Sequence, residues 1–145
     1  MGWNNNIRYG KFDLNVFVRG VFGNKIFNAT RADLSYVTAA SGRNILVSAK
    51  DDKITDTKNS YYSTRYIEKG DYVRLDNATL AYTFSNPVKA VNSLRIYTSV
   101  NNLFTITKYK GIDPEINQGG VAPGIDYNNF YPKTRTILFG VNVSF

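Results

Sequence analysis

Apolar and polar residues alternate with a period of two along much of the chain, which predicts β-strands. The clearest case is residues 134–145, T-R-T-I-L-F-G-V-N-V-S-F, where every odd-numbered position from Ile137 to Phe145 is apolar. The even-numbered positions are small or polar, except for Leu138. Successive side chains of a strand point to opposite faces, so one face would contact lipid or a protein core and the other water. The segment is also long enough for a tilted strand to cross a bilayer, which takes about 9–11 residues.

The same alternation recurs, and the four strands that it predicts are residues 11–22, 72–84, 94–109 and 134–145. In the first of these, the apolar face begins at Phe12, whereas Asp13 and Arg19 project from the opposite face. A pore-facing surface accepts such charges and a lipid-facing surface does not. In the second, the alternation changes phase near Asp76–Asn77, which predicts a β-bulge there.

The connections between these strands alternate in length. Residues 23–69 and 111–133 are long, whereas residues 85–93 form a short turn in which Asn86–Pro87 suits a chain reversal. Outer-membrane barrels keep short turns on the periplasmic side and long loops outside. We therefore expect both long connections to be extracellular loops, the short one to be a periplasmic turn, and the C-terminus to be periplasmic.

The first long connection has weak local patterns of its own. A short helix is possible near residues 28–40, with Asn28 or Thr30 as its N-cap. Residues 44–49 could form a short strand. Connections of this length are usually functional or externally exposed.

Composition excludes several classes of function. The sequence has no cysteine and no histidine, so disulfides, thiol chemistry, the usual zinc sites and Ser-His-Asp catalysis are absent. We expect no catalytic, cofactor-binding or metal-binding residue, and no enzymatic activity. The net charge of +7 comes from basic residues spread along the chain, so nucleic acid is not an expected partner. No run approaches the roughly 18 apolar residues of a transmembrane helix.

Four segments resemble the C-terminal end of SusC/RagA-type TonB-dependent outer-membrane transporters. The most specific is V-N-N-L-F-T-I-T-K-Y-K-G-I-D-P-E, residues 100–115. The others are residues 65–84 (R-Y-I-E-K-G-D-Y-V-R-L-D-N-A-T-L-A-Y-T-F), residues 131–145 (Y-P-K-T-R-T-I-L-F-G-V-N-V-S-F) and residues 17–28 (F-V-R-G-V-F-G-N-K-I-F-N).

The resemblance implies an all-β fold, in which the chain supplies the last four or so strands of an antiparallel transmembrane barrel of about 22 strands. It also implies an N-terminal plug, energy supplied by TonB through that plug, and a SusD-like surface lipoprotein as a lid. Location in a Gram-negative outer membrane (Bacteroidota) and import of an oligosaccharide or peptide follow from the same resemblance. Four strands alone would leave unpaired edges in hydrocarbon, so we expect other polypeptide and the bilayer to surround the chain.

Few residues are candidates for a site. Tyr127, Phe130 and Tyr131 could stack on sugar rings at the extracellular mouth, or could pack against the lid or neighbouring loops. The terminal aromatic, Phe145, resembles the family's outer-membrane assembly signal, and would equally suit an anchor at the membrane interface. Asp113-Pro114-Glu115 is interpreted as a turn rather than as a catalytic acid pair.

Two other architectures fit parts of the pattern. One is a complete small outer-membrane barrel of about eight strands with a structural or adhesion role, which would need further strands within residues 23–69 or before residue 11. The other is a soluble carbohydrate-binding β-sandwich, which would bury its apolar faces between two packed sheets.

Overall fold

The computed structural model describes residues 1–51, 61–116, 124–127 and 131–145. The chain divides into two compact units, which are considered separately. The strand unit comprises residues 1–21, 72–106 and 133–145, and the loop unit comprises residues 22–71 and 107–132. Within the described residues, no helix is long and apolar enough to span a membrane.

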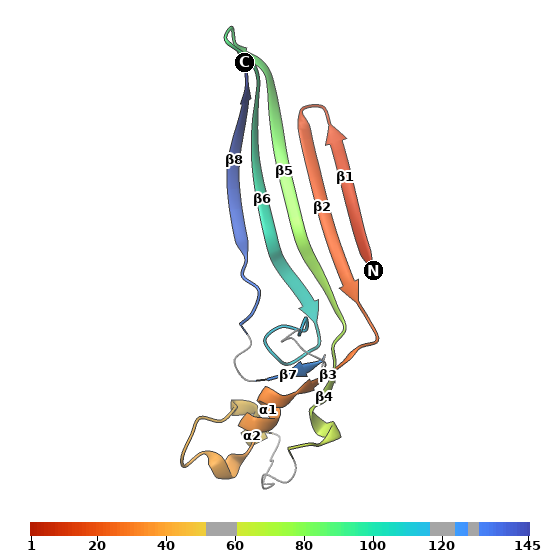
Figure 1. The fold of residues 1–145 in the computed structure, drawn as a ribbon, viewed down its shortest axis with the longest axis vertical. Coiled ribbons are helices and arrows are strands. Elements are labelled where there is room, and N and C mark those ends of the chain that lie inside the picture. The colour runs from red at the N-terminus through yellow and green to blue at the C-terminus, as the bar shows by residue number, and fades with distance from the viewer. Residues whose placement is uncertain (52–60, 117–123, 128–130) are drawn as a thin grey trace. The chain divides into compact units, whose positions relative to one another are not determined.

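The strand unit is one five-stranded sheet in the order β1-β2-β5-β6-β8 (Figure 1). Adjacent strands with a described register run antiparallel. The bounds are β1 Gly2–Tyr9, β2 Phe12–Val21, β5 Tyr72–Val88, β6 Val91–Thr107 and β8 Thr136–Ser144. The C-terminus lies beside the turn that joins β5 to β6 (Figure 1). A predominantly antiparallel strand fold is therefore confirmed, and the facing second sheet of a sandwich is absent from the described part of this unit.

Strand β1 was not predicted, and the expected count of about four strands is five in this sheet. It pairs with β2 along its whole length, from Gly2 opposite Arg19 to Tyr9 opposite Phe12. The turn expected at residues 85–93 is also shorter than predicted, because β5 runs to Val88 and β6 begins at Val91. Asn86 takes a positive φ of 47° inside β5 rather than at the centre of a chain reversal.

The two faces of the sheet differ in chemistry. One face carries exposed apolar side chains from every strand, among them Trp3, Phe12, Leu80, Ile96 and Phe139. Cross-strand pairs place these residues together, as Phe12 opposite Tyr82, whose rings meet edge to face with centroids 4.6 Å apart. We call this the apolar face, and it agrees with the alternation seen in the sequence.

The opposite face, the polar face, is held by a cross-strand network of side-chain hydrogen bonds. Asn15 Nδ2 on β2 donates to the Oδ1 atoms of both Asn4 and Asn6 on β1, at 3.1 and 2.5 Å. Across β5 and β6, the hydroxyls of Thr79 and Ser99 lie 2.8 Å apart. Pairs of this kind satisfy polar groups that would be costly on a surface facing hydrocarbon.

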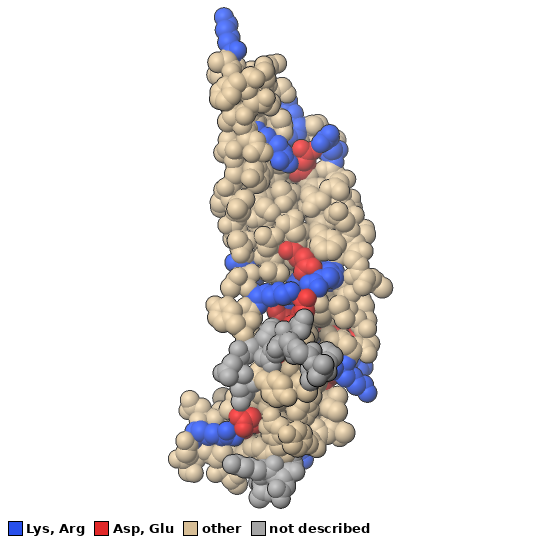
Figure 2. Space-filling model, viewed as in Figure 1, with Lys and Arg blue, Asp and Glu red and all other residues tan. Residues whose placement is uncertain are grey.

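Charged side chains on the polar face are also paired. Arg8 Nε lies 2.6 Å from Asp13 Oδ1, and Arg19 Nε lies 2.7 Å from Asp76 Oδ2. Figure 2 shows acidic and basic side chains next to one another in this way. Charge on the polar face is thus partly neutralised within the sheet itself.

The predicted bulge is present in β5. The register with β2 shifts between Phe17, which pairs with Asn77, and Val18, which pairs with Leu75. Asp76 is therefore the extra residue, and its carboxylate accepts two hydrogen bonds from Arg19. The bulge restores the alternation, because regular pairing through Asp76 would turn Arg74 onto the apolar face and Leu75 onto the polar face.

The loop unit is built around a small three-stranded sheet in the order β4-β3-β7. Its strands are β3 Lys25–Asn28, β4 Ile67–Lys69 and β7 Ile125–Asp126. The short helices of this unit are α1 Ala29–Leu34 and α2 Val47–Asp51, with 3₁₀ turns at Val37–Ala39 and Thr64–Tyr66.

The local predictions for this unit had mixed outcomes. Asn28 does cap α1, since its Oδ1 accepts a hydrogen bond from Arg31 N at 2.8 Å, but the helix ends at Leu34 rather than near residue 40. The strand expected at residues 44–49 is wrong: the chain there leads into α2. The small sheet was not predicted, because strands of two to four residues carry too little periodicity to detect.

Candidate ligand-binding site

The small sheet of the loop unit has two contrasting faces, set by its register. Phe27 on β3 pairs with Ile67 on β4 and with Ile125 on β7, so these three apolar residues share one face. The neighbouring position Asn28 pairs with Asp126 and shares the other face with Glu68 through Ile26. Unusually, the polar side chains Asn28 and Asp126 are buried, at 2% and 4% exposure.

The Glu68 carboxylate accepts hydrogen bonds from three other residues of the loop unit. Its Oε1 accepts hydrogen bonds from Arg31 Nη1 at 3.1 Å and from Asn28 Nδ2 at 3.4 Å. Its Oε2 accepts from the backbone N–H of Lys110 at 2.9 Å. The Arg31–Glu68 pair is largely shielded from solvent, with both side chains 11% exposed. A charged pair removed from water is tolerated only when further hydrogen bonds satisfy it, as they do here.

Asp126 forms hydrogen bonds with Tyr109 and Thr30. The Tyr109 hydroxyl donates a 2.5 Å hydrogen bond to Asp126 Oδ2, and the Thr30 hydroxyl lies 3.3 Å from the Asp126 carbonyl oxygen. Burial is the largest cause that raises the pKa of Asp126, and the hydrogen bonds from Tyr109 and Thr30 oppose that rise. Burial, reinforced by the bond to Asp126, also raises the pKa of Tyr109 well above its ordinary value. The pair therefore favours a protonated tyrosine as donor.

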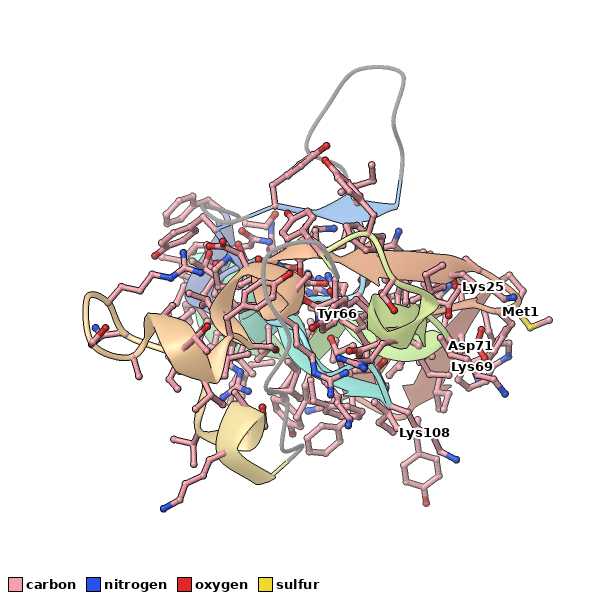
Figure 3. The ribbon with its side chains drawn as sticks, turned by 90° about the horizontal axis from the view of Figure 1, so that it is seen from below. Met1, Lys25, Tyr66, Lys69, Asp71 and Lys108 are labelled. Atoms are coloured by element: carbon pink, nitrogen blue, oxygen red, sulfur yellow. The ribbon has the colours of Figure 1, made fainter. Side chains whose placement is uncertain are left out.

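Asp71 forms hydrogen bonds with two other residues near the boundaries of the loop unit. Its Oδ1 accepts a hydrogen bond from Gly23 N at 2.6 Å, and its backbone oxygen accepts from the Thr107 hydroxyl at 2.8 Å. Figure 3 places Asp71 near Lys25 and Lys69, at the edge of the unit, and shows Tyr66 further in. Tyr66 is fully buried, at 0% exposure.

The apolar face of the small sheet is the floor of an open pocket of about 340 Å³. Phe27, Ile67 and Ile125 form the floor, and tyrosines surround it. The lining residues are Phe27, Tyr61, Tyr62, Ser63, Thr64, Ile67, Ile125 and Tyr127, and we call this hollow the aromatic pocket. The volume is at the lower end of the range for small-molecule sites, about 300–1,000 Å³.

The rings of the aromatic pocket contact one another. The Tyr61 and Tyr62 rings meet edge to face with centroids 4.9 Å apart, and the Phe27 and Tyr62 rings are nearly parallel, at 18° and 6.3 Å. Tyr62 is 89% exposed and Tyr127 is 52% exposed. Burial raises the pKa of Tyr61, and the neighbouring Asp33 carboxylate raises it further. The Tyr61 hydroxyl is therefore protonated and neutral at physiological pH.

The three aromatic residues predicted for a site have different positions. Tyr127 lines the aromatic pocket, which supports its selection as a candidate without testing its role. Tyr131 is 79% exposed and is not among the lining residues, and Phe130 lies outside the described residues. Sequence reasoning missed Phe27, Tyr61 and Tyr62. The Tyr61–Tyr62 doublet was a usable signal, but nothing in the sequence placed it near Tyr127.

The other expected features are located as follows. Asp113 Oδ1 accepts a hydrogen bond from Glu115 N at 2.9 Å, so this segment is a turn, as interpreted. Phe145 follows β8 and is 83% exposed, and its role in outer-membrane assembly stays a prediction. Across the described part of the chain, no group of three or more acidic residues is arranged to hold a metal ion.

Long antiparallel strands with one apolar and one polar face, joined by short turns and long loops, define a segment of a transmembrane barrel wall. Comparison with known proteins shows which receptors this chain resembles. The chain is 33% identical to TonB-dependent receptor P3 of Formosa agariphila and 30% identical to TonB-dependent receptor SusC of Bacteroides thetaiotaomicron. Both alignments cover 100% of this chain.

Solved structures show the same fold. The RagAB peptide importer in its open-open state aligns with a TM-score of 0.72 over 99% of this chain, at 23% identity. The RagAB peptide transporter aligns with a TM-score of 0.70 over 94% of the chain, at 24% identity. No family model matches the sequence. The resemblance to a segment of SusC/RagA-type TonB-dependent receptors is thus confirmed, and these receptors are outer-membrane proteins.

The chain spans only part of these proteins. It covers 16% of the Formosa receptor, 15% of SusC, and 17% of the RagAB chain in the open-open state. What the whole protein carries, and with which partners, is therefore a matter for proposal.

Proposed function

We propose that the chain is part of an outer-membrane TonB-dependent importer of an oligosaccharide or peptide. In this role the strand unit is a piece of the barrel wall, and the loop unit is a piece of the extracellular surface. The observation that carries the proposal is similarity to TonB-dependent receptors along the whole of this chain, combined with a sheet that has one mainly polar and one mainly apolar face.

The separation of faces supports a membrane location for the strand unit. The apolar face exposes large side chains on each strand that would be unfavourable in water. The polar face, in contrast, satisfies its amides and hydroxyls within the sheet. Lipid on one side and a hydrated, plug-filled lumen on the other would match both faces.

The positions of the turns support an orientation. The short turns after Tyr9 and Val88, and the C-terminus, lie toward one end of the sheet (Figure 1). At the other end of the sheet, β2 ends and β5 begins, and the sequence between them belongs to the loop unit. Because barrel turns of this length are periplasmic, we propose a periplasmic C-terminus and an extracellular loop unit. The proposed partners are the remaining barrel with its plug, TonB acting through the plug, and a SusD-like lipoprotein over the loops.

Uptake in a strain that carries the complete receptor tests the proposal. Deleting the receptor gene and deleting TonB should each abolish growth on the same oligosaccharide or peptide, and re-expression should restore it. A single cysteine at Tyr62 should react with a membrane-impermeant maleimide on intact cells, whereas one at Ala90 should react only after the outer membrane is permeabilised. Uptake that continues without TonB, or labelling in the reverse order, would refute the proposal.

A further inference from the structure

We propose that the aromatic pocket binds a neutral sugar ring, which makes an oligosaccharide the substrate of the importer. The inference rests on the proposed function, because it takes the loop unit to face arriving substrate. It names one site and one ligand class, where the proposed function leaves oligosaccharide and peptide open.

The pocket is lined by aromatic residues, two of which are strongly exposed. A pyranose has an apolar face of C–H groups and a polar edge of hydroxyls, so it packs flat on an aromatic ring and hydrogen-bonds at its rim. Tyr62 and Tyr127 combine rings of this kind with high exposure, at 89% and 52%. Tyrosine is suited to such contact because it offers a large rigid surface and a polar tip at little entropic cost.

The polar groups of the pocket are hydroxyls. Tyr61, Tyr62 and Tyr127 each supply a phenol, and Ser63 and Thr64 supply two aliphatic hydroxyls. None of the described lining residues is Asp, Glu, Lys or Arg. A charged ligand would leave its charge without a partner on desolvation, whereas sugar hydroxyls can both donate to and accept from these groups.

The floor of the pocket is fixed before any ligand arrives. Phe27, Ile67 and Ile125 are held in register by the small sheet, and Phe27 N donates a 2.8 Å hydrogen bond to Gly124 O. On the reverse face, their sequence neighbours Asn28, Glu68 and Asp126 are anchored by the buried hydrogen bonds. A site on locked strands loses little freedom on binding, which favours affinity.

A peptide fits this pocket less well. An apolar side chain could fill the floor, but a peptide's charged termini would find no counter-charge among the described lining residues. The combination of exposed aromatic residues, hydroxyls and an uncharged lining therefore favours a sugar.

Binding to the purified complete receptor tests the inference directly. The probes are neutral oligosaccharides of glucose, mannose and galactose, an oligogalacturonate as an anionic sugar, and a neutral hexapeptide. Isothermal titration should show that at least one neutral oligosaccharide binds and that the oligogalacturonate and hexapeptide bind at least tenfold more weakly. Tyr62→Ala and Tyr127→Ala should each weaken binding about tenfold or more. Tyr62→Phe, which keeps the ring, should stay within about threefold of the native protein.

Tyr131→Ala is the matched control, because this exposed tyrosine of the same unit does not line the pocket. It should bind like the native receptor. The inference is overturned if no neutral oligosaccharide binds, if Tyr62→Ala and Tyr127→Ala bind normally, or if only the hexapeptide depends on these residues. TonB-dependent uptake of a peptide without sugar binding would overturn this inference and leave the proposed function intact. Sugar binding at the pocket with TonB-independent uptake would overturn the proposed function and leave the assignment of the pocket as a sugar site intact.

Discussion

The Tyr109 hydroxyl and the Asp126 carboxylate are joined by a buried 2.5 Å hydrogen bond that links two distant stretches of the loop unit. Tyr109 lies two residues past the end of β6, and Asp126 belongs to β7 of the small sheet. A Cβ atom at Gly111 would overlap the Tyr109 ring, so the glycine makes room for the ring. The floor of the aromatic pocket thus depends on contacts on its hidden side.

Removing this hydroxyl should loosen the loop unit. Tyr109→Phe leaves a buried Asp126 oxygen without its donor, which costs about 1–3 kcal/mol. Limited proteolysis of the intact receptor should show faster cleavage in the loop unit and unchanged cleavage elsewhere. Tyr131→Phe, at an exposed site, is the control and should match the native protein. Equal cleavage rates for both variants would contradict the role given to the Tyr109–Asp126 bond.

The Tyr109–Asp126 pair also predicts that the loop unit loses stability at alkaline pH. Burial and Asp126 raise the pKa of Tyr109 above its ordinary value of 10.0, so the folded loop unit holds the phenol proton more tightly than the unfolded chain. The stability from Tyr109 is complete below pH 10 and is lost as the pH rises above it. In the difference between native and Tyr109→Phe titrations, tyrosinate absorbance should therefore appear well above pH 10. A difference step at pH 10 would show that Tyr109 is solvated.

The contact between Tyr97 and Gly140 predicts coupled substitutions in the barrel wall. The Tyr97 ring covers Gly140 on the adjacent strand, and a Cβ at Gly140 would overlap that ring. Gly140→Ala should destabilise the barrel by about 1–3 kcal/mol, since overpacking forces Tyr97 from its place. Tyr97→Ser should remove most of that penalty in the double variant. Unfolding in urea, followed by the mobility of the folded form on gels, measures both, and additive effects would contradict the contact.

The bulge predicts the effect of a deletion. Without Asp76, Asn77 and Leu75 become neighbours opposite Phe17 and Val18, so residues 72–75 keep their partners on β2 and their faces. Deleting Asp76 should therefore still allow assembly into the outer membrane, with loss of the bond to Arg19, and Asp76→Asn should assemble and lose only part of that bond. The amount of each variant in outer-membrane fractions gives the comparison. Failure of the deletion to assemble while Asp76→Asn assembles would refute the assignment.

Periodicity was a good guide where strands are long. The phase change in the second predicted strand correctly located the bulge at Asp76. In a strand with two contrasting faces, a shift of register changes the alternation of apolar and polar residues and is therefore visible in the sequence. Strand β1 was missed although Trp3 and Ile7 alternate with polar neighbours, since Asn5 interrupts the apolar face. The structure defines β1 as a strand through its pairing with β2, which the local sequence does not show.

The candidate site was much less predictable. The aromatic pocket combines residues from three separate stretches of sequence, represented by Phe27, Tyr62 and Tyr127. Strands of two to four residues are specified by their partners and by the buried polar network, and neither is visible in local sequence. Of the residues that line the pocket, only Tyr127 was selected in advance, and the Tyr61–Tyr62 doublet was not.

The most direct test of the account is site-directed labelling of single cysteines along the strand unit in outer membranes. The chain has no native cysteine, so each introduced thiol of this segment is unique. Spin labels at Asn15, Thr79 and Ser99 should be accessible to water-soluble nickel complexes, and labels at Leu14, Leu80 and Ile96 should be accessible to oxygen dissolved in lipid. This alternation with a period of two is the result that the account predicts. Equal access of both probes to both sets of positions would contradict a barrel wall with one face in lipid.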